Sequence, residues 1–164
     1  FNLKKEWLTL EEVVGSALGA CASLLEGRPL KVNLAPDLPL LHLDAVLIER
    51  VLVNLLENAV KYAGYKAEIG IRAQASADKL DLEVWDSGPG IPAGQEQKIF
   101  DKFSRGNKES AIPGVGLGLA ICQAIVEVHD GEIIAANRAE GGASFHVILP
   151  LPPQPELAEM NEVM

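Results

Sequence analysis

The sequence predicts an α/β (α+β) two-layer sandwich, in which helices cover one face of a mixed, mainly antiparallel sheet. The chain has 164 residues, of which 48% are hydrophobic and 23% charged, a balance typical of one globular domain. Apolar residues recur with helical spacing in some segments and alternate with polar residues in others. Short turns between neighbouring alternating segments favour antiparallel pairing.

The N-terminal quarter is expected to mix short strands with one helix. Thr9 and Glu12 form a capping-box pattern that opens this helix, and Gly27 and Pro29 follow its expected end. The expected elements are a strand over 4–8, a helix to about residue 25, and strands over 30–34 and 40–43.

The rest of the chain continues the same alternation, with one long interruption. Asp44 can cap a long helix, and Gly64 can end it. Residues 87–115 hold several Gly and Pro residues and little periodicity, which is typical of a lid, a binding loop or a disordered segment. The expected elements are helices over 45–62, 95–103 and 117–128, strands over 67–75 and 79–85, and a hairpin of 132–137 with 143–149. Residues 1–150 are expected to form the domain, and 151–164 a Pro-rich, then acidic tail.

Composition excludes several classes of function. The net charge of −9 argues against nucleic acid as a partner, because such binding depends on basic side chains. Cys21 and Cys122 lie far apart, which argues against a disulfide scaffold or zinc knuckle and fits a reducing compartment. No apolar run approaches the ~20 residues of a membrane helix, and no signal peptide is visible. The chain starts at Phe1 rather than Met, so we expect a piece of a larger protein.

The helix over 45–62 carries a polar stripe on an otherwise apolar sequence. Asn54, Asn58 and Lys61 fall on one face, and Tyr62 borders them. Asparagine is a poor interior helix residue, and amide oxygens can ligate Mg²⁺ while a lysine neutralises phosphate. A solvated stripe on a half-exposed helix is the alternative.

Two glycine-rich segments could complete a nucleotide site. Asp86 ends a strand before Gly88 and Gly90, where its carboxylate could accept a hydrogen bond from the adenine amine and repel the guanine carbonyl. A plain strand-exit turn is the alternative. The run GVGLGL, from Gly114, opens a helix whose free N–H groups suit phosphate, whereas a flexible hinge is the alternative.

Together, the order and spacing of these motifs resemble the histidine-kinase ATP-binding domain. Asn58 in NLLENAVKY, then DSGPGI, IFDKF, GVGLGL and EGGASF, are similar to its N, G1, F, G2 and G3 boxes. The similarity spans about 40–149 and implies the Bergerat fold of the superfamily shared with gyrase, Hsp90 and MutL. The segments FNLKKEWLTLEEVVGSAL and IFDKFSRGNKESAIPGVGLGLAI look, more narrowly, like potassium-responsive sensor kinases.

The resemblance implies ATP and Mg²⁺ as cofactors. Asn58 would ligate Mg²⁺ with help from Asn54, and Asn58 and Lys61 would be the catalytic pair. Asp86 would bind the adenine amine, with Ser144 nearby, under a mobile lid over about 104–115. The expected nucleotide-contacting residues are Asn54, Asn58, Lys61, Tyr62, Asp86, Gly88, Gly90, Ile91, Phe103, Arg105, Gly114, Val115, Gly116, Leu117, Gly118, Leu119 and Ser144.

One position and one absence define the expected activity. Hydrolytic members of the superfamily carry a water-activating Glu four residues before the Mg²⁺-ligating Asn, where this chain has Asn54, and an amide cannot act as a general base. We find no phosphoacceptor-histidine box in the sequence. The resemblance therefore implies a domain, itself monomeric, that passes the γ-phosphoryl group to a histidine on a separate dimerisation domain. The parent would be an inner-membrane sensor with this domain in the cytoplasm, and it would phosphorylate a response regulator.

Three other functions remain open at the level of sequence. A serine protein kinase of the anti-sigma type uses similar boxes, and a nucleotide-sensing module could bind ATP without transfer. A purely structural interaction domain would need neither the asparagine stripe nor the glycines.

Overall fold

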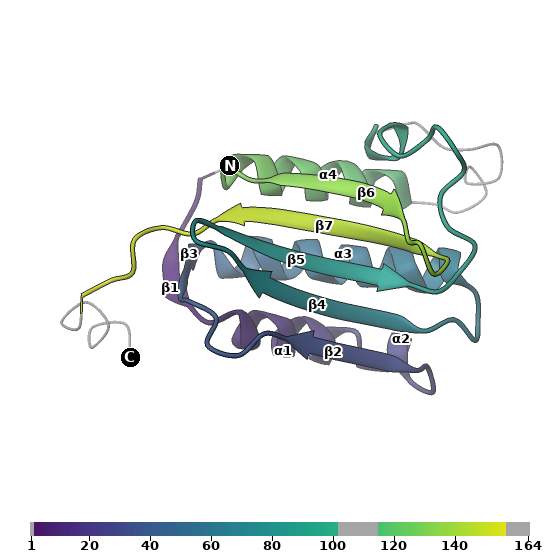
Figure 1. Cartoon of the computed structure of the whole chain (residues 1–164), viewed down its shortest axis with the longest axis horizontal. Helices are drawn as coiled ribbons and strands as arrows, with labels where there is room; N and C mark the ends of the chain where they lie inside the picture. The colour runs from purple at the N-terminus through teal and green to yellow at the C-terminus, as the bar shows by residue number, and fades with distance from the viewer. Residues whose placement is uncertain (1, 102–114, 157–164) are drawn as a thin grey trace.

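The structure, a computed structural model, describes residues 2–101 and 115–156. A five-stranded sheet has the order β2-β4-β5-β7-β6, and β1 and β3 form a separate two-stranded sheet at one end (Figure 1). The strands are β1 (Glu6–Leu8), β2 (Leu30–Leu34), β3 (Leu41–Leu43), β4 (Ile69–Ala75), β5 (Lys79–Asp86), β6 (Glu132–Asn137) and β7 (Ala143–Pro150). The helices are α1 (Leu10–Ala20), α2 (Ala22–Leu25), α3 (Ala45–Ala63), α4 (Val115–Val128) and the 3₁₀ helix η1 (Lys98–Phe100).

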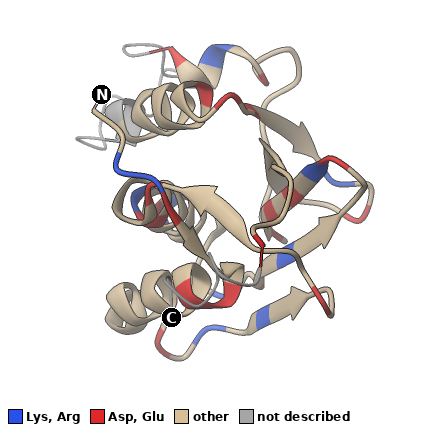
Figure 2. Ribbon diagram, turned by 90° about the vertical axis from the view of Figure 1, so that its left-hand side faces the viewer, with Lys and Arg blue, Asp and Glu red and all other residues tan. Residues whose placement is uncertain are grey.

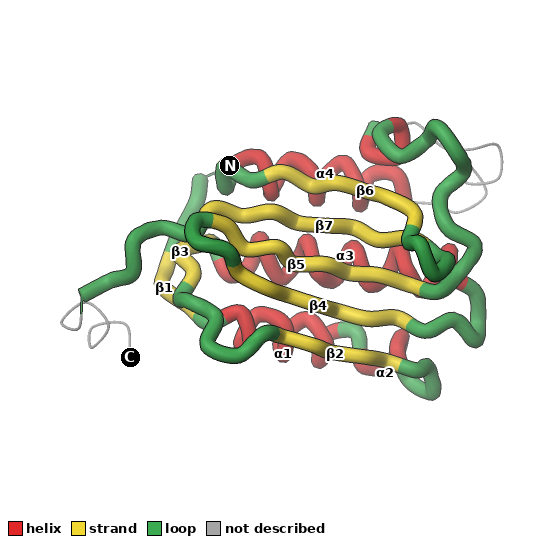
Figure 3. Tube along the Cα trace, in the orientation of Figure 1, coloured by secondary structure: helices red, strands yellow, loops and turns green. Residues whose placement is uncertain are grey.

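The molecule has the two layers that the sequence predicts. The helices α1, α3 and α4 lie side by side across one face of the large sheet (Figure 3). An end-on view shows the helices on one side and the strands on the other (Figure 2). The pair β2–β4 is parallel and the other three pairs are antiparallel, which confirms the mixed, mainly antiparallel sheet.

The core lies between these layers and is mostly aliphatic. On β5, Leu80, Leu82 and Val84 are buried and alternate with more exposed residues, as a strand with one covered face requires. On α3, Leu52, Leu55 and Leu56 are fully buried. The same helix therefore contributes to the core along one side and presents polar residues along another.

Both predicted helix caps are present. The Thr9 hydroxyl accepts the Glu12 N–H at 3.3 Å and donates to the Glu12 carboxylate at 2.9 Å, which completes the capping box. Asp44 Oδ1 accepts the Leu47 N–H at 3.1 Å, and Asp44 Oδ2 accepts the Lys4 N–H at 3.0 Å. The hydrogen bond from the Lys4 N–H is the main cause that lowers the pKa of Asp44.

The strands expected over 4–8 and 67–75 each begin two residues later, at Glu6 and Ile69, and three expected helices also differ from the structure. The helix expected to reach residue 25 breaks at Cys21, whose N–H is shared between Ala17 O and Leu18 O at 3.1 and 3.2 Å, so the last turn forms a separate α2. The helix expected over 95–103 is only the three-residue η1 among the described residues, in a segment rich in Gly and Pro. The helix expected from residue 117 begins at Val115, so two of the motif's glycines, Gly116 and Gly118, lie inside it.

The start of the predicted tail contacts the domain. Leu151 donates its N–H to Asp78 O at 2.8 Å, and the Gln154 side chain bonds Leu40 N and O at 2.9 and 3.0 Å. Across the residues that the structure describes, no helix combines the length and hydrophobicity needed to cross a membrane.

Candidate nucleotide-binding site

The structure confirms that Asn54, Asn58 and Lys61 share one face of α3, and the central residue, Asn58, is buried. Asn58 is only 9% exposed, and its Oδ1 has no hydrogen-bond partner among the described residues. Lys61 is exposed and Tyr62 is half-buried. Glu57, which precedes Asn58 in the sequence, is exposed on another side of the helix. A buried amide oxygen without a partner is costly, so this atom is suited to receive a ligand.

Asn54 joins this stripe to the start of α4. Its Nδ2 donates to Gly118 O at 3.5 Å, and a Cβ added at Gly118 would lie 3.9 Å from Asn54 Cγ. The glycine-rich segment and the asparagine stripe are therefore neighbours, although about 60 residues separate them in the sequence. Leu119, one residue further along α4, is buried in the core.

Cys122 holds α4 against α3 rather than supplying chemistry. Its thiol is buried and donates to Val51 O at 3.7 Å. Burial raises the pKa of the Cys122 thiol to about 12, so the thiolate that would react is not formed at neutral pH.

Asp86 ends β5 on the covered face of the sheet. It is 4% exposed, and its Oδ1 accepts the N–H groups of Gly88 at 2.8 Å and Ala143 at 3.3 Å. No described residue donates to Oδ2. Burial raises the pKa of Asp86, although these two hydrogen bonds and the charge of Arg138 oppose the rise. The arrangement fixes one carboxylate oxygen and leaves the other for a donor.

The loop after Asp86 is packed closely on both sides. A Cβ at Gly88 would lie 2.4 Å from Ala63 Cα, at the end of α3. A Cβ at Gly142 would lie 1.9 Å from Asp86 O, in the turn between β6 and β7. Only glycine permits these close approaches, which explains one glycine in each motif, Gly88 in DSGPGI and Gly142 in EGGASF.

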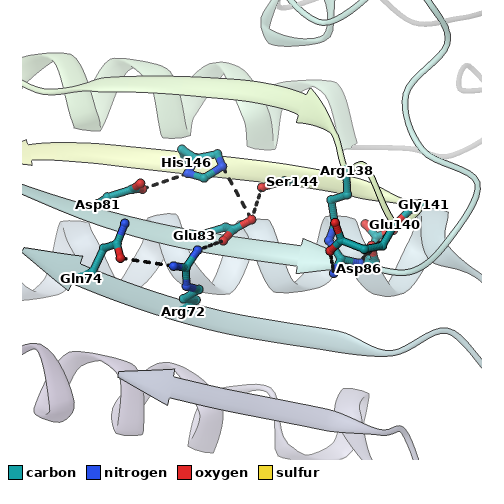
Figure 4. Close-up of polar contacts among 10 residues, drawn as sticks. All are labelled: Arg72, Gln74, Asp81, Glu83, Asp86, Arg138, Glu140, Gly141, Ser144 and His146. Carbon is teal, nitrogen blue, oxygen red and sulfur yellow. Dashed lines mark hydrogen bonds and ion pairs between the residues drawn. The ribbon is translucent and has the colours of Figure 1, made fainter. Parts of the chain in front are cut away.

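Ser144 is not brought together with the Asp86 side chain. It lies opposite Trp85 in the sheet, and its hydroxyl donates to Glu83 Oε2 at 2.5 Å on the uncovered face (Figure 4). The alternation of side chains along β5 puts Glu83 and Asp86 on opposite faces. The family's Thr or Ser role at this position is thus not supported by this geometry.

The uncovered face carries its own polar network (Figure 4). Glu83 lies 3.7 Å from Arg72 and 3.6 Å from His146, which also lies 2.9 Å from Asp81. Arg138 stacks 4.1 Å over the Trp85 ring and pairs with Glu140 at 3.1 Å. All of these residues except Asp81 line a hollow of about 510 Å³. Arg72, Arg138 and Lys31, the described Lys and Arg residues that line the hollow, are each paired with a glutamate, so they leave no unpaired positive charge there for an anion.

The lid expected over 104–115 lies almost wholly outside the described residues, and so do Phe103, Arg105 and Gly114. Val115, Gly116 and Leu117 form the first residues of α4. Sequence reasoning missed Asn137 and Arg138, which contact the Asp86 loop from the β6–β7 turn. Their only signal was a polar pair between a strand and a glycine turn, which is common to many hairpins.

The described residues fit a bound Mg²⁺. Mg²⁺ takes oxygen ligands, keeps several waters and uses few protein groups alongside substrate phosphates. The orphaned, buried Asn58 Oδ1 is such an oxygen, and Asn54 lies one helical turn away on the same face.

Known proteins resemble this chain in both sequence and fold. Residues 43–153 match the family model described as histidine kinase-, DNA gyrase B-, and HSP90-like ATPase. The chain is 65% identical to the sensor protein KdpD of Escherichia coli over all its 164 residues, and 38% identical to KdpD of Clostridium acetobutylicum over 91% of the chain. It spans 18% and 17% of the lengths of these curated relatives.

Solved structures agree with the sequence relatives. The catalytic domain of histidine kinase ThkA, in a nucleotide-free form, has a TM-score of 0.80 at 27% identity, covering 92% of this chain and 99% of that one. The mycobacterial sensor histidine kinase MprB has a TM-score of 0.79 at 28% identity, covering 92% and 100%. The chain therefore belongs to the histidine kinase-, DNA gyrase B- and HSP90-like ATPase family, as an ATP-binding domain of the KdpD-type sensor histidine kinases.

Proposed function

We propose that this domain holds Mg·ATP and donates its γ-phosphoryl group to a histidine on a dimerisation domain of the same parent protein. The observation that carries the proposal is Asn58 Oδ1, a buried polar atom that has no partner among the described residues. It lies one helical turn from Asn54, whose amide bonds Gly118 O near the start of α4. A buried polar atom without a partner is stabilised when a ligand binds it.

The residues divide between the two ends of the nucleotide. Asp86 Oδ2 is the acceptor for the adenine amine, since Gly88 and Ala143 already occupy Oδ1. Asn58 and Asn54 would hold Mg²⁺, which would neutralise phosphate charge when bound. Lys61 is exposed on the same face of α3 and can approach a phosphate.

The choice of transfer over hydrolysis rests on Asn54. Its amide bonds Gly118 O and cannot take a proton from water, so no general base occupies this position of the helix. Phosphoryl transfer depends mainly on positioning and charge neutralisation, so the accepting histidine can lie on a separate domain.

We extend the proposal to the parent protein by similarity. KdpD is named a sensor protein, and ThkA is known in complex with the response regulator TrrA. We propose that the parent passes the phosphoryl group to an aspartate of a response regulator in a potassium or osmotic response. We also propose that the isolated domain is monomeric, that it works in the cytoplasm below an inner-membrane sensor, and that the nucleotide domain ends near residue 150.

Calorimetry with Mg·ATP and Mg·GTP tests the nucleotide site. We expect the chain to bind ATP and not GTP, because guanine presents a carbonyl where Asp86 needs a donor. Asp86→Asn should bind ATP at least tenfold more weakly, since an amide replaces the charged acceptor. Absence of ATP binding by the folded wild-type chain would overturn the proposal.

A further inference from the structure

We propose that Asn137 is a positioning residue that holds the Asp86 loop, residues 86–91, in the shape that receives adenine. The proposal deepens the proposed function, since it concerns the same nucleotide site. Asn137 is the last residue of β6, 46 positions from the loop residue that it contacts, Ile91. It acts through the backbone of that residue.

Both polar atoms of the Asn137 amide bind the backbone of Ile91. Asn137 Oδ1 accepts the Ile91 N–H at 2.7 Å, and Asn137 Nδ2 donates to Ile91 O at 2.9 Å. A side-chain amide that bonds both groups of one residue replaces the partner that a neighbouring strand would provide. Ile91 is thereby fixed in position and direction, and its side chain packs against the core.

Gly90 fits against the same amide. Its φ is +88°, and an added Cβ would lie 2.5 Å from Asn137 Oδ1 and 3.4 Å from Gly142 O. A larger residue at Gly90 would be strained and would displace the amide. The glycine of DSGPGI and Asn137 therefore form one packed unit.

The other end of the loop is attached to the same turn. Arg138 Nη1 donates to Asp86 O at 3.1 Å and to Gly141 O at 3.1 Å (Figure 4). Arg138 thus holds the residue that leaves β5, and Asn137 holds the residue five positions later. Neither bond uses the Asp86 carboxylate, so the two residues shape the loop without occupying the adenine acceptor.

This arrangement has a consequence for affinity. The backbone after Asp86 lies outside the sheet, and Ser87 is held by its N–H bond to Glu68 O at 3.0 Å, so beyond Ser87 the order of the loop depends mainly on side-chain bonds. A loop that must become ordered on binding lowers affinity by the free energy of that ordering. Loss of the Asn137 amide should weaken ATP binding about tenfold, which corresponds to ~1.4 kcal/mol.

The test compares Asn137→Ala with a matched control, Asn33→Ala. Asn33 is also an exposed strand asparagine, but no side-chain hydrogen bond is seen for it in residues 2–101 and 115–156. Mg·ATP affinity is measured by calorimetry, and amide hydrogen exchange is followed at Ile91 and at Val147 in the buried centre of β7. We expect Asn137→Ala to weaken ATP binding about tenfold and to speed exchange at Ile91 but not at Val147. Asn33→Ala should change neither.

Asn137→Asp adds a graded variant, because it can still accept the Ile91 N–H but has no N–H for Ile91 O. Its affinity should lie between those of the wild type and Asn137→Ala. ATP binding by Asn137→Ala within twofold of wild type would overturn the proposal. Faster exchange at Ile91 and Val147 together would also overturn it, since Asn137 would then act on global stability. If the wild type does not bind ATP, the proposed function fails, while exchange at Ile91 still decides whether the amide orders the loop.

Discussion

The two faces of the large sheet differ in whether their polar groups have hydrogen-bond or charge partners. On the face covered by helices, Asn58 Oδ1 is buried without a partner among the described residues, and burial raises the pKa of Asp86. On the uncovered face, Arg72, Glu83 and His146 satisfy one another within 3.7 Å. Asp86 and Glu83 belong to the same strand, β5, so the difference in partners comes from the face to which each side chain points.

The difference separates binding from stability. Polar groups that the fold leaves unsatisfied reduce stability and are retained where a ligand completes them. Polar groups that satisfy one another leave a ligand little to gain. Changes to Asn58 or to the Asp86 carboxylate should therefore affect nucleotide binding more than folding, and changes to the polar network of the uncovered face should do the reverse.

The largest expected effect is that of Asn58→Ala on phosphoryl transfer. In a parent protein that contains its phosphoacceptor domain, autophosphorylation should fall roughly 100-fold, because a metal ligand is lost. The free energy of unfolding should change by less than ~1 kcal/mol, because the mutation also removes an unsatisfied buried oxygen. Radiolabelled ATP and thermal denaturation measure the two quantities.

Glu57→Ala is the matched control for this variant. Glu57 is adjacent in sequence but exposed, about 100° round the helix from Asn58. It should retain full transfer. Full activity in Asn58→Ala would remove the main difference between the two faces.

The second effect is a loss of ATP affinity on acidification. The pKa of Asp86 is raised, so its carboxyl gains a proton at pH values where exposed carboxyls are still ionised. A protonated Oδ2 would donate rather than accept, and affinity should fall about tenfold per pH unit below this pKa. Calorimetry from pH 8 downward measures the fall, and Asp86→Asn should lack the step that Asp86 causes.

The fold should survive this acidification. A raised folded pKa means that protonation of Asp86 favours the folded state between that pKa and the ordinary value of 3.8. Asp44 behaves oppositely: its pKa is lowered, so its stabilising effect is present above 3.8 and is lost only as the pH falls through the lower folded pKa. If the chain unfolded over the same pH range in which ATP binding is lost, the two effects of Asp86 protonation would not be separate.

The third effect belongs to the uncovered face. Glu83→Ala removes the shared partner of Arg72, Ser144 and His146 and should lower the free energy of unfolding by ~1–3 kcal/mol. ATP affinity should remain within twofold of wild type. Urea denaturation and calorimetry check both values, with Glu132→Ala, an exposed residue of β6, as the control. A loss of ATP binding in Glu83→Ala would show that the two faces are coupled.

The sequence predicted the covered face better than its surroundings. Periodicity was sufficient for α3 and β5, because long regular elements repeat their signal, and Asp44 and Thr9 lie where caps are expected. Asn54 and Asn58 were found because asparagine is unusual inside a helix. The break between α1 and α2 at Cys21 was missed because no proline marks it. The backbone differs from a continuous helix mainly in that the Cys21 N–H is shared by two carbonyls.

Contacts between distant segments could not be found in this way. Asn137 becomes informative only when the fold brings it to Ile91, and strand register alone directs Ser144 toward Glu83. Both results depend on which strands pair and in which register, and one residue of shift would reverse every side chain.

The smallest expected effect is that of Lys31→Ala at the edge of the uncovered face. Lys31 pairs with Glu68 at 3.3 Å, but the two side chains are 68% and 31% exposed. Solvent screens such a pair, so the free energy of unfolding should fall by less than ~0.5 kcal/mol and ATP affinity should not change. Urea denaturation compares this variant with Glu83→Ala. The comparison tests whether the several partners of a partly buried side chain stabilise this face more than one exposed ion pair does. Equal losses of stability in the two variants would show that the network adds nothing beyond its individual pairs.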